Sequence, residues 1–329
     1  MATLYINRPE LELKHEGNAI VVHERGQRRS SMPLKLIERV VIQHSTRLDT
    51  GLLLKLAEAG ASVLLLSPRH SRRVAILLGA AHNEAAIRLA QAQRVSQPEH
   101  AQIFARQIVL GKLHRQISVL KQALSERPDV RKPLFDSLQS LRDIQSRLQQ
   151  GEAPALSILR GHEGAAARSY FQGYAAILPP ALGFSGRNRR PPRDPVNTCL
   201  SLAYTLLHFD AVRAAHAAGL DPLLGFYHQP AFGRESLASD LIEPLRPHAD
   251  AWVWQQFRDR TLRPEHFSHD KDACLLGKAG REHFYASWEQ NARIHRRWLR
   301  AQTAALARQM RTDGLPLLAE ADDENLDDE

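Results

Sequence analysis

The chain has 329 residues, of which 43% are hydrophobic and 24% charged, as is usual for a protein with a buried core. This length accommodates two domains of ordinary size. No apolar run approaches the roughly 20 residues of a membrane span, and the first residues do not form a signal peptide. The only cysteines, Cys199 and Cys274, lie far apart. A zinc ribbon and a disulfide framework are therefore excluded, and a cytoplasmic location is expected.

The chain is basic, with 44 Lys and Arg residues against 36 Asp and Glu residues and a net charge of +8. Seven of the acidic residues lie in positions 320–329, which contain no basic residue. Without these positions, 44 basic residues face 29 acidic ones, a balance that favours a polyanionic partner such as nucleic acid. The alternative is a basic protein whose charge serves only solubility. We expect residues 319–329 to form a disordered acidic tail.

Residues 1–80 carry the pattern of short strands around one helix. Segments rich in β-branched and aliphatic residues alternate with turn dipeptides such as Arg8-Pro9 and Arg25-Gly26. An amphipathic helix is predicted over 49–59, where Gly60 provides the stop. Strands are expected at 3–6, 11–13, 19–22, 39–43, 62–66 and 74–78. These elements predict a small N-terminal β-domain.

From about residue 83 onward, apolar residues recur every three or four positions, which is the period of a helix. Two loops interrupt the pattern, an Arg- and Pro-rich one over 179–195 and a mixed polar one over 261–280. The predicted fold class is therefore α+β, with a β-domain over 1–80 and a larger all-α domain over 81–318, joined near 79–84. Helices are predicted over 85–93, 100–124, 131–149, 156–178, 195–218, 238–258 and 281–311.

One acidic residue lies on the apolar face of a predicted helix. If the segment is helical, Glu163 shares a face with Leu159 and Tyr170. A carboxylate in such a place must be paired, protonated or bound to a cation, because burying it alone is too costly. The structural alternative is a buried ion pair with Arg160 or Arg168. The functional alternative is a bound cation.

Three further polar residues lie downstream of Glu163. His228 follows a short apolar run, and Asp240 and Glu243 are three positions apart, which makes them neighbours on a helix. The structural alternatives are a core histidine and an acidic first turn of a helix. Together with Glu163, they form a ligand set suited to Mg²⁺ or Mn²⁺. In a basic protein, such an ion can neutralise a phosphodiester and activate an attacking oxygen.

The loop over 186–194 concentrates arginines between prolines. Arginine side chains bind phosphate through two parallel hydrogen bonds, so this loop is a candidate phosphate contact. A solvated loop with exposed arginines is the alternative. The arginines are Arg187, Arg189, Arg190 and Arg193.

Five motifs follow one another in a specific order. They are Gly-x-Glu-Gly at 161–164 with Tyr-Phe at 170–171, Gly-Arg-x-Arg-Arg-Pro-Pro-x-Asp-Pro-x-Asn at 186–197, Leu-Ser-x-x-Tyr-x-Leu-Leu at 200–207, Gly-Phe-x-His at 225–228 and Asp-Leu-x-Glu-Pro-x-Arg-Pro at 240–247. In this order they resemble the core integrase of CRISPR adaptation, a metal-dependent DNA endonuclease that inserts spacers into CRISPR arrays. The resemblance covers nearly the whole chain.

The resemblance implies roles for the polar residues. Glu163, His228 and Glu243 would bind the divalent metal ion, Mg²⁺ or Mn²⁺, and Asp240 would be the accompanying acid. The third ligand differs between members of the family, so the choice between Glu243 and Asp240 stays open. The resemblance also implies that the DNA backbone is contacted by Arg187, Arg190 and Arg193.

The implied reaction is attack of the 3′-hydroxyl of a spacer precursor on a phosphodiester of a CRISPR repeat. The resemblance further implies a homodimer formed through the β-domain, and two such dimers bridged by a small ferredoxin-like partner protein. Two other functions remain open at this point. One is a transposon-borne integrase of the same fold, and the other is a non-catalytic DNA-binding scaffold whose acidic residues are structural.

Overall fold

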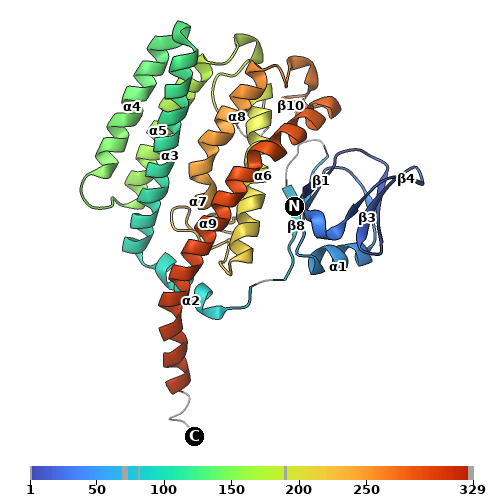
Figure 1. The fold of residues 1–329 in the computed structure, drawn as a ribbon. Helices are drawn as coiled ribbons and strands as arrows, with labels where there is room; N and C mark the ends of the chain where they lie inside the picture. Colours follow the sequence, from blue (N-terminus) through green and yellow to red (C-terminus); the bar gives the residue numbers. More distant parts are fainter. Residues whose placement is uncertain (1, 69–72, 81, 189–190, 325–329) are drawn as a thin grey trace. The chain divides into compact units, whose positions relative to one another are not determined.

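The computed structural model describes residues 2–68, 73–80, 82–188 and 191–324, with side chains described as far as residue 318. The chain divides into two compact units, one of Met1–Ala81 with Thr261–Arg293 and one of His82–Arg260 with Ile294–Glu329. Strands dominate the N-terminal part and helices the rest, which confirms the predicted α+β class (Figure 1). The segment 261–293, assigned above to the helical domain, belongs by its contacts to the first unit.

The first unit contains two four-stranded sheets. In one sheet, β1, β5 and β7 are parallel and β8 pairs antiparallel at the edge, with bounds Ala2–Ile6, Ile37–Ile42, Ser62–Leu66 and Arg73–Leu77. In the other sheet, β4, β3 and β2 are antiparallel and β6 pairs parallel with β2, with bounds Gln27–Pro33, Ala19–Glu24, Leu11–Glu16 and Arg47–Leu48. The sequence did not predict β4, because its residues are polar and mostly exposed, and the period of the pattern is lost there.

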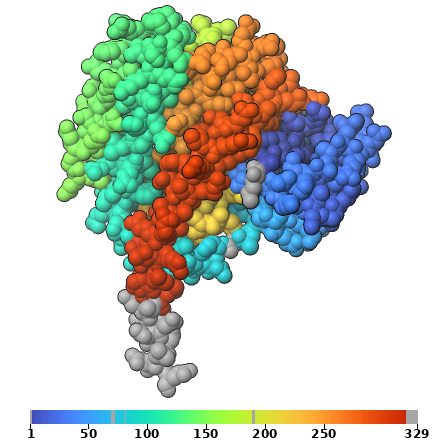
Figure 2. Space-filling model, in the orientation of Figure 1, coloured from blue at the N-terminus to red at the C-terminus, as the bar shows by residue number. Residues whose placement is uncertain are grey.

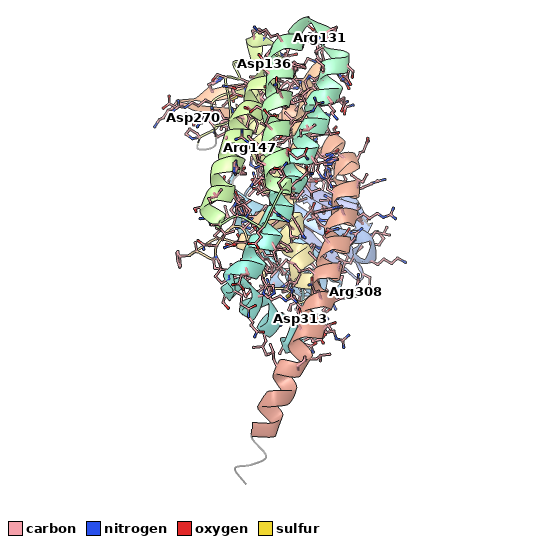
Figure 3. The ribbon with its side chains drawn as sticks, turned by 90° about the vertical axis from the view of Figure 1, so that its left-hand side faces the viewer. Arg131, Asp136, Arg147, Asp270, Arg308 and Asp313 are labelled. Atoms are coloured by element: carbon pink, nitrogen blue, oxygen red, sulfur yellow. The ribbon has the colours of Figure 1, made fainter. Side chains whose placement is uncertain are left out.

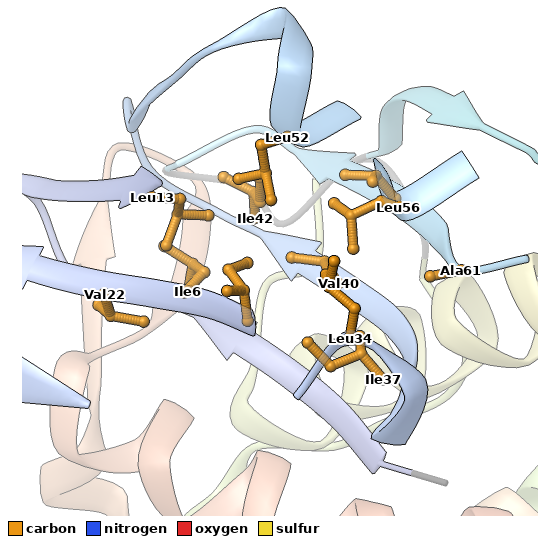
Figure 4. Close-up of a cluster of buried hydrophobic side chains, with 12 residues drawn as sticks. Ile6, Leu13, Val22, Leu34, Ile37, Val40, Ile42, Leu52, Leu56 and Ala61 are labelled. Atoms are coloured by element: carbon orange, nitrogen blue, oxygen red, sulfur yellow. The ribbon is translucent and has the colours of Figure 1, made fainter. Parts of the chain in front are cut away.

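Aliphatic side chains of both sheets and of α1 (Thr50–Glu58) form the core of this unit (Figure 4). Asp49 caps the start of the helix, because its carboxylate accepts the Leu52 N–H at 2.6 Å. The helix ends just before Gly60, which has φ +69°. The helix predicted over 49–59 is thus confirmed within one residue at each end. Labelled members of the core are Ile6, Leu13, Val22, Leu34, Ile37, Val40, Ile42, Leu52, Leu56 and Ala61.

The segment predicted as a polar loop contains a hairpin. After the 3₁₀ turn η5 (Pro264–His266), β9 (Phe267–Asp270) pairs with β10 (Ala273–Leu276), and α9 begins at Lys278. The turn residue Lys271 has φ +53°, a conformation that Gly or Asn usually adopts, so a lysine at this position does not indicate a turn. The start of α9 joins the first unit through Tyr285, whose ring stacks on Tyr5 at 4.3 Å and whose hydroxyl donates to Gln43 at 2.6 Å.

The second unit is a helical bundle. The helix predicted over 238–258 is broken into α7, the 3₁₀ turn η4 (Glu243–Leu245) and α8, because Pro244 cannot donate a backbone hydrogen bond inside a helix. Within the described residues, no helix is both long and apolar enough to span a membrane. The helices α2 to α8 have the bounds Ala85–Ser96, Pro98–Glu126, Arg131–Gln149, Leu156–Ala176, Pro195–Ala217, Ser236–Ile242 and Arg246–Arg258.

The later part of α9 (Lys278–Glu324) packs beside α2, as the red and teal residues of Figure 2 show. Ion pairs join Arg94 to Asp313 at 2.7 Å and Arg311 to Glu84, the residue before α2, at 2.6 Å. A Cβ at Gly314 would lie 2.0 Å from the Ala86 carbonyl oxygen, so this approach requires glycine. The backbone is helical to residue 324, and residues 325–329 lie outside the described residues, so the acidic tail expected over 319–329 stays a prediction.

Candidate active site

Asp240, near the end of α7, fixes the segment that carries His228. Its side chain is fully buried, and its Oδ2 accepts the backbone N–H groups of Phe226 at 2.7 Å and Tyr227 at 3.0 Å. Its Oδ1 accepts the backbone N–H of His228 at 2.9 Å and hydrogen-bonds to the His228 ring Nδ1 at 2.7 Å. Four donors therefore use both oxygens of this carboxylate, which leaves Asp240 poorly placed to bind a cation.

The hydrogen bond to Asp240 also determines the tautomer of His228. Because a carboxylate can only accept, the Nδ1 atom carries the proton, and Nε2 keeps its lone pair when the ring is neutral. Nε2 lies 4.0 Å from Glu243 Oε1, and the His228 side chain is 20% exposed. A metal-binding histidine is commonly oriented by such a carboxylate.

Gly225, the first residue of the Gly-Phe-x-His motif, allows this segment to fold tightly against α7. A Cβ at this position would lie 2.5 Å from the carbonyl carbon of Ser236 and 2.7 Å from the carbonyl oxygen of His228. The neighbouring Leu237 N–H donates to the Pro222 carbonyl at 2.9 Å. The segment therefore requires glycine at 225 to present His228 beside Asp240.

Glu163 and Glu243 meet at a residue that sequence analysis missed. Lys112 of α3 pairs through Nζ with Oε1 of Glu163 and, at 2.7 Å, with Oε2 of Glu243. Of the candidate structural partners, Arg160 donates to the Tyr227 carbonyl at 3.2 Å, and Glu163 pairs with Lys112 instead. The signal in the sequence was a lysine inside the apolar run Ile108–Leu113, where a buried cation needs an anionic partner.

Glu243 is buried, with a side chain 7% exposed, and the Lys112 side chain is 11% exposed. Burial raises the pKa of Glu243, but the nearby charges of Arg246 and Lys112 outweigh it and hold that pKa at about 2. Burial lowers the pKa of Lys112, and the charges of Glu243 and Glu163 outweigh that effect and raise it. Glu243 and Lys112 are therefore both charged at neutral pH, and Arg246 Nε lies 2.9 Å from Glu243 Oε1.

Arg246 belongs to a further buried network in the second unit. Its guanidinium lies 4.6 Å from the centre of the Tyr204 ring, and the Tyr204 hydroxyl donates to the Asp250 carboxylate. The Tyr174 hydroxyl donates to the Asp250 carbonyl oxygen at 2.8 Å. Burial raises the pKa of Asp250 to about 6. This network holds Arg246 against Glu243, and sequence analysis did not anticipate it.

The side chains at this centre are of the types that bind a divalent ion, but three of them do not lie close enough together to do so. Across 2–68, 73–80, 82–188 and 191–324, no group of three His, Cys, Asp or Glu side chains is close enough to hold a metal ion. The Lys112 ammonium stands between the two carboxylates, where a cation would bind both. Glu163, Glu243 and His228 Nε2 offer the oxygen and imidazole ligands that Mg²⁺ and Mn²⁺ accept.

The predicted DNA-contacting arginines differ in their surroundings. Arg187 donates to Asn197 Oδ1 at 2.7 Å and to Ser201 Oγ at 3.0 Å, and its guanidinium lies 5.3 Å from the centre of the Tyr204 ring. It therefore anchors the loop to α6. Arg193 is exposed. Arg190 lies outside the described residues, as does Arg189.

A shallow groove of about 470 Å³ lies between α4 and α5. Figure 3 labels two of its residues, Asp136 and Arg147, on α4. The groove also contains His162, the residue before Glu163, and Asp143. Like those of the Lys112 centre, these groups form no cluster of three metal-binding side chains in the described part of the chain.

Comparisons with known proteins agree with these motifs. The sequence model of the family described as CRISPR associated protein Cas1 matches residues 4–290. A CRISPR-associated endonuclease Cas1 from Thermodesulfovibrio yellowstonii is 36% identical over 94% of this chain and 97% of the relative.

Two solved structures share the fold. A casposase bound to an integration product has a TM-score of 0.82 and 19% identity, and the match covers 95% of this chain and 91% of the casposase. A chain of a Cas6-RT-Cas1–Cas2 complex has a TM-score of 0.80 and 23% identity, and the match covers 95% of this chain and 35% of that one.

Proposed function

This chain belongs to the Cas1 family of CRISPR-associated endonucleases, and we propose that it is a divalent-metal-dependent DNA integrase that inserts spacer DNA into CRISPR arrays. One observation carries the proposal. Carboxylates from α5 and η4 pair with a single buried ammonium, and the carboxylate from η4 also lies 4.0 Å from the free ring nitrogen of a histidine. A purely structural ion pair would not require a histidine held in one tautomer beside it.

The residues have separate roles in this proposal. Glu163, Glu243 and His228 Nε2 hold Mg²⁺ or Mn²⁺, and Asp240 keeps the imidazole oriented through Nδ1. The ion, when bound, stabilises the charge that develops on the phosphate during in-line displacement by a 3′-hydroxyl. Arg246 keeps Glu243 ionised and in place.

A strand-joining assay tests this function. Purified protein would be mixed with a DNA duplex bearing free 3′-hydroxyl ends and a supercoiled plasmid carrying a CRISPR repeat, in Mn²⁺, Mg²⁺ or EDTA. We expect metal-dependent joining that Glu163→Ala abolishes, with exposed Glu152→Gln as the matched control. DNA binding without cutting or joining in any metal would instead favour the non-catalytic scaffold.

The shared fold of the casposase supports integrase chemistry and keeps the transposon-type alternative open, because 19% identity establishes the fold alone. The two alternatives differ in their target. We expect joining to a plasmid that carries a CRISPR repeat to exceed joining to the same plasmid without it, and equal joining to both would favour the transposon-type function.

We also propose that the chain forms a homodimer through its β-domain and that a small ferredoxin-like protein bridges two dimers. The Cas2-containing complex supports a partner of this kind, since one of its chains shares this fold. Light scattering of the purified chain should give the mass of a dimer, and adding the partner should give a larger complex. A monomer that is unchanged by the partner would contradict this assembly.

The arginines of the 186–194 loop should respond differently to mutation. Arg193 is exposed, and we propose that it contacts a DNA phosphate; Arg193→Gln should then lower the slope of log K against log salt by about 1. Arg187 is held by Asn197 and Ser201, so Arg187→Gln should lower the melting temperature of the protein. Binding titrations at several salt concentrations check the first variant and thermal unfolding checks the second; an unchanged slope for Arg193→Gln would remove it from the interface.

A further inference from the structure

Lys112 is the one residue at the centre of the site that the proposed reaction does not use. Its ammonium pairs with both carboxylates that would bind a metal ion, and its side chain is 11% exposed. A positive charge is needed there in any case, because the buried Glu243 carboxylate and the partly buried Glu163 carboxylate would repel each other without a cation. The lysine therefore supplies the charge that a metal ion would supply.

We propose that the Lys112 ammonium is a built-in cation that must leave its place between Glu163 and Glu243 before a divalent ion can bind both, so that this lysine sets the metal affinity of the site. The inference rests on the proposed function, because it takes these carboxylates as the metal ligands. It adds a control element to that function: the ammonium neutralises the two carboxylates, and an ion binds both only in exchange for the lysine.

The surroundings of Lys112 are suited to such an exchange. Glu243 keeps a second cationic partner, Arg246 at 2.9 Å, when the ammonium withdraws. Glu163 is the more accessible partner, with a side chain 25% exposed, so it can exchange the ammonium for an ion arriving from solvent. At Gly111, the residue before Lys112, α3 lies close to η4, since an added Cβ there would lie 3.5 Å from Pro244 Cγ, at van der Waals distance.

The competition predicts the sign of a mutational effect. If Lys112 occupies the site in most molecules, the apparent dissociation constant for the ion exceeds the intrinsic one by the inverse of the free fraction. A site that is free in about a tenth of the molecules would bind about tenfold more weakly than one without the lysine. Removing the ammonium should therefore tighten metal binding, whereas removing an ordinary supporting residue should weaken it.

The test measures Mn²⁺ binding to the full chain without DNA, by the loss of the free Mn²⁺ signal in electron paramagnetic resonance. Four proteins are compared: wild type, Lys112→Met, Glu163→Gln and Lys121→Met. Lys121 is an exposed lysine on the same helix as Lys112, so Lys121→Met is the matched control. We expect Lys112→Met to bind Mn²⁺ about tenfold more tightly than wild type, Lys121→Met to match wild type, and Glu163→Gln to lose the site. The melting temperature without metal should fall in Lys112→Met and recover with Mn²⁺.

The outcomes separate this inference from the proposed function. If wild type binds Mn²⁺ through Glu163 but Lys112→Met binds it equally or more weakly, the lysine does not compete and the inference is overturned while the metal site stands. If no protein binds Mn²⁺ better than Glu163→Gln, both the inference and the metal site are overturned. Should Lys112→Met fail to fold, Lys112→Gln repeats the test, because its amide can donate to the carboxylates without a charge.

Discussion

Replacing Asp240 by Asn is expected to destabilise the second unit by about 3 kcal/mol and to lower DNA joining by about 10- to 100-fold. The carboxylate accepts from three successive backbone N–H groups and from the His228 ring. The amide group of Asn carries one acceptor oxygen and two donors, so donors would face donors at a fully buried position. The His228 ring would also lose the partner that fixes its tautomer.

Two measurements separate the two effects of this variant. Thermal unfolding reports the loss of stability, which should be about 6 °C or more if each kcal/mol lowers the midpoint by about 2 °C in a chain of this size. The joining assay, run well below the midpoint, reports the loss of activity. Asp136→Asn, an exposed carboxylate on α4, should change neither. Full stability with lost activity would mean that Asp240 binds the metal ion itself.

Glu243→Gln should cost about 3–5 kcal/mol of stability and remove joining activity, because it leaves Lys112 and Arg246 as buried cations with too little negative charge. Glu243 is the group whose pKa these two cations hold at about 2. A folded-state pKa below the ordinary value means that the carboxylate contributes stability above its unfolded pKa, near 4.5, and that this contribution is lost as the pH falls toward 2.

A double variant tests whether the cost arises from unpaired charge. Lys112→Met added to Glu243→Gln should recover at least about 1 kcal/mol, since it removes one of the unsatisfied cations. Chemical denaturation of wild type, both single variants and the double variant gives this coupling energy, and Glu152→Gln serves as the control for loss of an exposed charge. Additive effects would show that Lys112 and Glu243 do not act as a pair.

The features that follow from local periodicity could be predicted from the sequence. The change from short apolar runs to a three- and four-residue period gave the α+β class, and α1 and α4 lie within one residue of their predicted bounds. The hairpin of β9 and β10 was missed, because its strands are four residues long and a lysine occupies the position with positive φ. Its place in the first unit depends on contacts such as Tyr5 with Tyr285, which are distant in sequence.

The polar residues of the site could be identified from the sequence, but the role of each one could not. Spacing placed Asp240 beside Glu243 on a helix, yet Asp240 accepts from the His228 backbone while Glu243 pairs with Lys112. The partner of Glu163 comes from α3, more than fifty positions earlier, and nothing local to Glu163 indicates it. Arg187 lies in an arginine-rich loop and was therefore predicted to contact phosphate. Its side chain instead donates to Asn197 of α6, a contact that the loop sequence does not indicate.

The most direct test of the metal site is a crystal of the chain grown with Mn²⁺ and examined by anomalous diffraction at the manganese edge. We predict one anomalous peak bonded to Glu163, Glu243 and His228 Nε2, with the Lys112 ammonium withdrawn from between the carboxylates and Asp240 still hydrogen-bonded to Nδ1. A peak only in the groove of Asp136, Asp143 and His162, or no peak with Lys112 still in place at saturating Mn²⁺, would contradict the assignment of this centre as the metal site.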